Sequence, residues 1–163
     1  MVIADHGARV YGKQSIPIHS YEIPLLIAGP AVVKAASRVS QLGCSLDVSP
    51  TVLGLLGRSY ETMFFGRDLL NMQPEDGRVF LGHNRDIGML AHDRLVVLGL
   101  MKTSEFYEGN PKAVEMSLLS QPTDADRELE KDAIAIYQVA DDLYSNRRYR
   151  IGEESDSKRS GKR

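Results

Sequence analysis

The sequence predicts a mixed α/β fold built around one core. Short apolar runs bounded by turn residues recur over residues 1–110, and an apolar stripe at helical spacing follows near the end of the 163-residue chain. Hydrophobic residues make up 42% of the chain and charged residues 26%, which is typical of a globular protein of this length.

The first expected elements are two buried strands, over residues 1–4 and 25–28, because each is a short apolar run between turn residues. We expect these strands to be neighbours in one sheet. Residues 7–20 between them are polar and contain glycine, as in a loop that faces a substrate.

A short helix is expected over residues 50–56. Ser49 is a suitable N-cap, Pro50 occupies the first helical position, and Gly57 is a plausible stop. The helix would pack through its apolar side chains, which are Val52, Leu53, Leu55 and Leu56.

An antiparallel meander is expected from residue 78 onward. The β-rich runs cover residues 79–81, 87–90, 95–100 and 103–107. Polar turn segments separate the runs and carry His83, Asp86, His92 and Asp93. A second metal site there is conceivable, but solvated turn residues are the favoured interpretation because the spacing of metal ligands is lacking.

The last expected element is an amphipathic helix within residues 111–150. Thr123 can cap it, acidic residues follow the cap, and Arg147, Arg148 and Arg150 suit its negative end. The apolar stripe consists of Leu129, Ala133, Ile136, Tyr137, Ala140, Leu143 and Tyr144. Packing onto the sheet is favoured over binding a partner. Residues 151–163 are expected to be a disordered tail because little in them could join a core.

The composition excludes several functional classes. A net charge of −2 gives no basic surface for nucleic acid. The single cysteine, Cys44, excludes an internal disulfide and is best interpreted as a buried, inert thiol. The most apolar stretch, residues 23–33, contains two prolines and is too short to span a membrane, and no cleavable signal begins the chain.

Asp5-His6-Gly7 is the most informative motif, because it places a carboxylate and an imidazole where the first expected strand ends. Ligands of open α/β sheets bind beyond the carboxyl ends of strands, so this pair fits one part of a metal site. A simple turn is an equally good interpretation of the tripeptide alone. We expect the loop after Gly7 to return His19 to the same crevice.

Three motifs in order resemble the C-terminal part of the sulfatase-like branch of the alkaline phosphatase superfamily. Within that branch the chain looks most like the lipoteichoic acid synthase (phosphoglycerol transferase) family, over roughly residues 1–110. The motifs are Ala4-Asp5-His6-Gly7 with Arg9, His19-Ser20-Tyr21-Glu22-Ile23-Pro24-Leu25, and residues 46–57, which include Asp47, Pro50 and Thr51.

The resemblance implies that residues 1–110 are a partial catalytic domain, the C-terminal portion of an alkaline-phosphatase-like sandwich with a small antiparallel sheet and a C-terminal helix. It implies that Asp5 and His6 ligate a catalytic divalent metal, and that His19 binds substrate phosphate or a second metal. A carboxylate and an imidazole suit manganese or zinc better than magnesium. Arg9 and Lys13 could meet an anionic substrate, or could equally be solvated surface charges.

The resemblance further implies a transferase or sulfatase that acts on phosphate or sulfate esters, with lipid head groups among the candidate substrates. The parent protein would lie in a bacterial inner membrane, with its catalytic domain on the outer face. The nucleophile and the membrane helices of the family have no counterpart here, so we expect the isolated chain to be inactive. The alternative is an inactive remnant with a structural or weak metal-binding role. A nucleophile motif upstream of Met1 would favour the enzyme.

Overall fold

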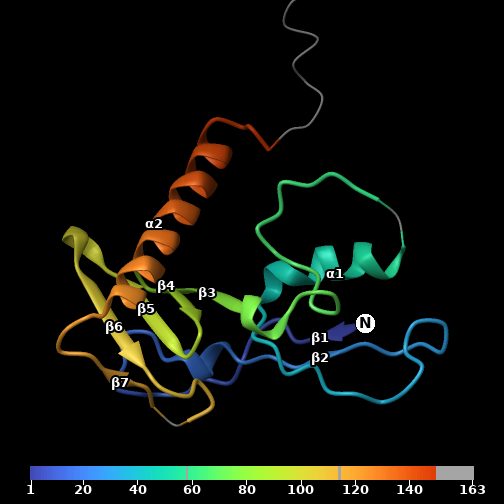
Figure 1. Cartoon of the computed structure of the whole chain (residues 1–163), viewed down its shortest axis with the longest axis horizontal. Coiled ribbons are helices and arrows are strands. Elements are labelled where there is room, and N and C mark those ends of the chain that lie inside the picture. Colours follow the sequence, from blue (N-terminus) through green and yellow to red (C-terminus); the bar gives the residue numbers. More distant parts are fainter. Residues whose placement is uncertain (58, 114, 150–163) are drawn as a thin grey trace, which may run out of the picture.

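A computed structural model of the chain describes residues 1–57, 59–113 and 115–149. Its strands form a two-stranded antiparallel sheet and a five-stranded sheet of order β3-β4-β5-β6-β7 (Figure 1). The small sheet pairs β1 (Val2–Ile3) with β2 (Leu25–Leu26). The expected pairing of these two segments is therefore confirmed.

The five-stranded sheet contains the predicted meander of four runs and one further strand, β7, and every neighbouring pair in it is antiparallel. Its first two turns are tight, and in the second His92 and Asp93 connect β4 to β5 with φ values of 50° and 57°. Asp and His are among the residues that adopt this left-handed conformation most readily. The strands are β3 (Arg78–His83), β4 (Asp86–Ala91), β5 (Arg94–Leu98), β6 (Ser104–Glu108) and β7 (Ser117–Leu118).

Both faces of the five-stranded sheet are covered, so the molecule has two apolar clusters. Ile16 and Ile18, near the N-terminus, pack on one face. The helix α2 (Asp124–Ser145) packs on the other, with Leu129 and Ala133 against Val96 and Phe106 (Figure 1). The prediction that the amphipathic helix packs onto the sheet is confirmed. Its C-terminal half projects past the strands, and Tyr144 is 77% exposed.

The N-terminus of α2 is capped as predicted. The Thr123 side chain accepts a hydrogen bond from the backbone N–H of Asp126, and the Asp126 carboxylate accepts one from the backbone N–H of Thr123. Asp126 is 1% exposed, and its Oδ1 also accepts a hydrogen bond from the guanidinium Nη1 of Arg94 at 2.6 Å. This ion pair fixes the start of the helix to strand β5.

The helix α1 (Val48–Leu55) begins before the predicted Pro50. A 3-10 turn, η2 (Ser45–Asp47), leads into it, so Asp47 rather than Ser49 is the N-cap. The predicted packing face is wrong in part: Leu53 and Leu55 are half-buried, but Val52 and Leu56 are exposed. Pro50 and Thr51 are buried instead, and the Thr51 hydroxyl donates to the carbonyl of Asp47 and accepts from the N–H of Leu69. Gly57 stops the helix with φ 66°, as expected.

The prediction that the first two strands are buried is wrong. Val2 and Leu26 face each other across the ladder and are 67% and 63% exposed. In the part of the chain that the structure describes, no third strand pairs with β1 or β2, so little covers their side chains.

The remaining helical turns are short 3-10 segments, namely η1 (Ile18–Tyr21), η3 (Pro74–Asp76) and η4 (Leu100–Lys102). Among the described helices, none combines the length and the apolar character needed to cross a membrane. The predicted tail, residues 151–163, and Arg150 lie outside the described residues.

Candidate functional site

Asp5 and His6 follow β1 after a single residue, Ala4, and lie at the surface. Their side chains are 92% and 83% exposed, and Asp5 Oδ1 lies 3.8 Å from His6 Nε2. His6 Nδ1 lies 3.0 Å from the carbonyl oxygen of Gly7. This hydrogen bond, helped by the charge of Asp5, raises the pKa of His6 above its ordinary value. The structure therefore brings together the two predicted metal ligands that are adjacent in sequence.

The loop after Gly7 folds back on residues 20–22. The Ser20 hydroxyl donates to the carbonyl of Val10 at 2.8 Å and accepts from its N–H at 2.9 Å. At Gly7 the two backbone segments are so close that an added Cβ would lie 2.5 Å from the carbonyl oxygen of Ser20 and 2.7 Å from that of Glu22. Glycine is thus required at this position for steric reasons.

A cavity of about 770 Å³, called here the His6 cavity, opens beside this loop. His6 and Arg9 line it together with Tyr21 and His83. The Tyr21 hydroxyl donates to the carbonyl of Gly82 at 2.6 Å and lies 2.8 Å from His83 Nδ1. The predicted substrate-binding Arg9 therefore shares a cavity with a predicted metal ligand.

His19 does not line the His6 cavity, and both of its ring nitrogens have hydrogen-bond partners. Nδ1 lies 2.7 Å from Glu22 Oε1, and Nε2 lies 2.6 Å from the carbonyl oxygen of Ala113. Both partners are acceptors, so only the doubly protonated ring makes both bonds. The hydrogen bond to Ala113, with a smaller contribution from Glu22, raises the pKa of His19 against the opposing effect of burial. To bind a metal, His19 would first have to give up one of these bonds.

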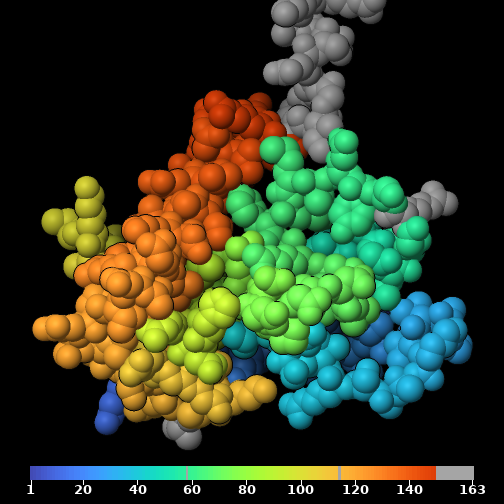
Figure 2. Space-filling model, in the orientation of Figure 1, coloured from blue at the N-terminus to red at the C-terminus, as the bar shows by residue number. Residues whose placement is uncertain are grey.

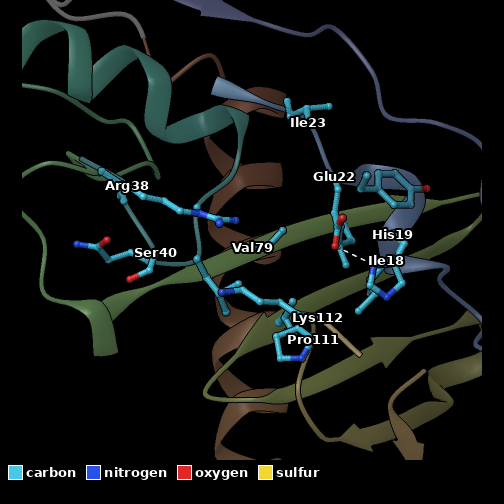
Figure 3. A pocket seen from close by; sticks show the side chains of 16 residues that line it. Ile18, His19, Glu22, Ile23, Arg38, Ser40, Val79, Pro111 and Lys112 are labelled. Carbon is cyan, nitrogen blue, oxygen red and sulfur yellow. Dashed lines mark hydrogen bonds and ion pairs between the residues drawn. The ribbon is translucent and has the colours of Figure 1, made fainter. Parts of the chain in front are cut away.

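His19 lines a second cavity, of about 480 Å³, called here the Arg38 cavity. Figure 3 shows Arg38 reaching into it from one side, with Glu22 and His19 on the other. Lys112 also lines it. Sequence reasoning did not find Arg38 or Lys112, and no local motif marks either residue, because only the fold brings their segments together. Its apolar lining residues include Ile18, Val79, Leu81 and Leu90.

The expected convergence of Asp5, His6 and His19 is not seen. Within residues 1–57, 59–113 and 115–149, no three His, Cys, Asp or Glu side chains are placed to hold one metal ion. A carboxylate and an imidazole at adjacent positions still form a chemically suitable pair of donors for manganese or zinc. The described residues therefore fit a divalent metal only in part.

Three other candidate residues, Cys44, His92 and Asp93, line neither cavity. Cys44 is half-buried, and burial raises the pKa of its thiol, so it is a poor nucleophile. His92 and Asp93 are exposed turn residues, in agreement with the favoured interpretation. That interpretation is wrong for His83 and Asp86, which are half-buried strand ends, the last residue of β3 and the first of β4.

Comparison with known proteins shows a similarity to a solved structure. No protein-family model matches this chain. A crystal structure of a protein in the alkaline phosphatase superfamily from Vibrio parahaemolyticus is similar, with a TM-score of 0.73 and 28% sequence identity. The similarity covers 90% of this chain and 35% of that one, so this chain spans about a third of that protein's length.

Proposed function

We propose that this chain, whose similarity supports membership of the alkaline phosphatase superfamily, supplies part of the active site of a metal-dependent enzyme acting on phosphate or sulfate esters. The observation that carries the proposal is the Asp5–His6 pair, which lies at the end of β1 beside a cavity that also contains Arg9. The finer proposal is a phosphoglycerol or phosphoethanolamine transferase, or a sulfatase, of the lipoteichoic acid synthase type.

In this proposal Asp5 and His6 hold manganese or zinc. The bound cation would stabilise negative charge on the non-bridging oxygens of the ester and help to generate a nucleophile at neutral pH. Arg9 would orient the anionic group through its guanidinium, which binds phosphate and sulfate oxygens in pairs. Gly7 keeps the loop that carries Arg9 close to residues 20–22. The assignment of His19 to substrate or to a second metal stays a prediction.

The site needs residues beyond this chain. Catalytic zinc sites use about three protein ligands, and Asp5 and His6 supply only part of such a set. Because the chain spans 35% of the similar structure, we propose that the missing ligands and the nucleophile lie outside it. We further propose a lipid head group as substrate and the outer face of a bacterial membrane as the location.

The competing proposal is an inactive remnant. It is favoured by the lack of a third suitably placed His, Cys, Asp or Glu side chain among the described residues. A remnant of this kind would keep the fold and bind a metal weakly through Asp5 and His6 alone.

Metal binding by the isolated chain tests the role of Asp5 and His6. We expect weak binding of Mn²⁺ or Zn²⁺ in calorimetric titration, and its loss in Asp5→Asn and His6→Asn. The control variants are His92→Asn and Asp93→Asn, which alter another exposed His-Asp neighbour pair without changing the candidate site. An equal loss in both pairs of variants would contradict the assignment.

Catalysis by the isolated chain tests whether the site is complete. We expect no turnover of phosphate monoesters, phosphodiesters or sulfate esters at any metal concentration, because the nucleophile is missing. Metal-dependent hydrolysis that disappears in Asp5→Asn would show that the chain holds a whole active site and would overturn the proposal of missing residues.

A further inference from the structure

The Arg38 cavity combines an apolar floor with cationic walls. Val79, Leu81 and Leu90 from the five-stranded sheet, together with Ile18, form apolar surface. At about 480 Å³ the cavity falls within the roughly 300–1,000 Å³ of typical small-molecule sites. We infer that it is a second binding site, for a small amphipathic anion, independent of the Asp5–His6 pair.

The charges that face the cavity favour an anion. The carboxylate of Glu22 is paired with His19 at 2.7 Å. The cations of Arg38 and Lys112 are not balanced in this way: among the described residues, no carboxylate lies within ion-pair distance of either side chain. A ligand with a single anionic head could therefore bind between these two walls.

The Lys112 wall is held in place by hydrogen bonds on both sides of the lysine. The N–H of Lys112 donates to Asn110 Oδ1 at 2.9 Å, and the N–H of Ala113 donates to the Asn110 carbonyl at 2.9 Å. His19 Nε2 then binds the Ala113 carbonyl at 2.6 Å. The turn is thus fixed to the η1 segment before any ligand binds, which lowers the entropic cost of binding.

The apolar floor distinguishes this site from a simple phosphate site. Leu81 and Leu90 belong to the core cluster, and Val79 packs against it half-buried. A short alkyl group could cover Val79 while its anionic head contacts Arg38 and Lys112. The shared chemistry is thus a phosphate or carboxylate carried on a short alkyl chain. Neither a bare anion nor a neutral alcohol would use both surfaces.

The test measures binding of hexyl phosphate to the full chain by NMR titration, at concentrations below the micellar concentration of hexyl phosphate. We expect saturable binding that is at least about tenfold tighter than binding of inorganic phosphate or hexanol. Arg38→Gln and Lys112→Gln should each weaken it about threefold to fivefold, as for partly exposed ion pairs. Val79→Thr should weaken hexyl phosphate binding and leave inorganic phosphate binding unchanged. Hexanoate, tested in parallel, distinguishes a carboxylate head from a phosphate head.

The matched controls are Lys34→Gln and Arg85→Gln, two exposed cations outside both cavities. Equal weakening in the control variants, equal affinity for inorganic phosphate, or no binding at millimolar concentration would overturn the inference. Weakening by Arg9→Gln would place the ligand in the His6 cavity instead, and would also overturn it. Metal titration of Arg38→Gln should match the unmodified chain, so failure of this site is distinguishable from failure of the metal site.

Discussion

His19 connects η1 to Ala113, which is far away in the sequence. Its protonation decides whether both of its ring nitrogens can donate a hydrogen bond. The imidazolium donates to Glu22 and to the carbonyl of Ala113. The neutral ring has a single N–H and must give up one of these hydrogen bonds. The turn that carries Lys112 is therefore tied to η1 more firmly at low pH than at high pH.

The stability of the chain should depend on pH through His19. Its pKa is raised in the folded state, so its contribution is fully present below the ordinary value of 6.5 and is lost as pH rises through the folded pKa. NMR titration should give a His19 pKa above 6.5. As pH rises from below 6.5 through the folded pKa of His19, the free energy of unfolding should fall less in His19→Gln than in His92→Asn. An ordinary His19 pKa would contradict the doubly bonded ring.

Gly7→Ala should destabilise the chain by about 1–3 kcal/mol, the usual cost of overpacking. The added Cβ would meet the carbonyl oxygens of Ser20 and Glu22, which are backbone atoms and cannot rotate away. Gly12→Ala is the matched control, because a Cβ there meets nothing within 4 Å. Urea denaturation of the two variants compares them, and equal midpoints would show that the loop is not packed as described.

Sequence reasoning could find Asp5 and His6 because they are adjacent and follow an apolar run. It could not find the Arg38 cavity for a physical reason. Lys112 and Arg38 line the same cavity only when the turn after β6 folds over η1. The partner of His19 is a backbone carbonyl, which every residue possesses and no sequence pattern marks.

At the scale of elements, the attachment of α2 to β5 depends on Asp126. Burial alone would raise the pKa of this carboxyl, but hydrogen bonds from Thr123 and Arg94 outweigh that effect and hold the pKa below its ordinary value. Asp126→Asn should cost about 1.5–3 kcal/mol of unfolding free energy, as for hydrogen bonds to charged groups.

Asp124→Asn is the control for that variant. It lies in the same first turn and is exposed, so it should cost only the interaction of a charge with the helix dipole, about 0.3–1 kcal/mol. Guanidinium denaturation at neutral pH measures both variants. Equal losses would mean that the pair between Asp126 and Arg94 contributes nothing beyond the helix dipole.

Elements with strong local signals could be predicted, and those defined by tertiary contacts could not. Strands β3 to β6 are apolar runs separated by residues that tolerate positive φ, such as Asn84 and Asp93. β7 was missed because it has only two residues, Ser117 and Leu118, and exists by pairing with β6. α1 starts earlier than predicted because the Asp47 carboxylate accepts hydrogen bonds from two backbone N–H groups. The bond from Cys44 belongs to a capping box around η2, and the bond from Arg67 is a tertiary contact that no local pattern marks.

At the scale of the whole molecule, the small sheet exposes apolar side chains and strand edges. Val2 and Leu26 are exposed apolar side chains on strands whose outer edges pair with no other described strand. We expect the purified chain to self-associate through this edge. Leu26→Lys should lower the average mass in sedimentation velocity, whereas Val139→Lys, at a 51% exposed site on α2, should not. Equal effects would point to another interface.

The two faces of the five-stranded sheet, one covered by α2 and the other by Ile16 and Ile18, should form at different stages of folding. The meander forms by closing short hairpin loops, and α2 follows it closely in the chain. Ile16 and Ile18 reach the opposite face only by closing a much longer loop, and the entropic cost of closure grows with loop length. Packing of α2 on its face of the sheet should therefore form first. Packing of Ile16 and Ile18 on the opposite face, called here the Ile18 face, should form last. By the same reasoning, the Ile18 face should be the first to open in native-state fluctuations, so the Arg38 cavity lies on the more labile side of the sheet.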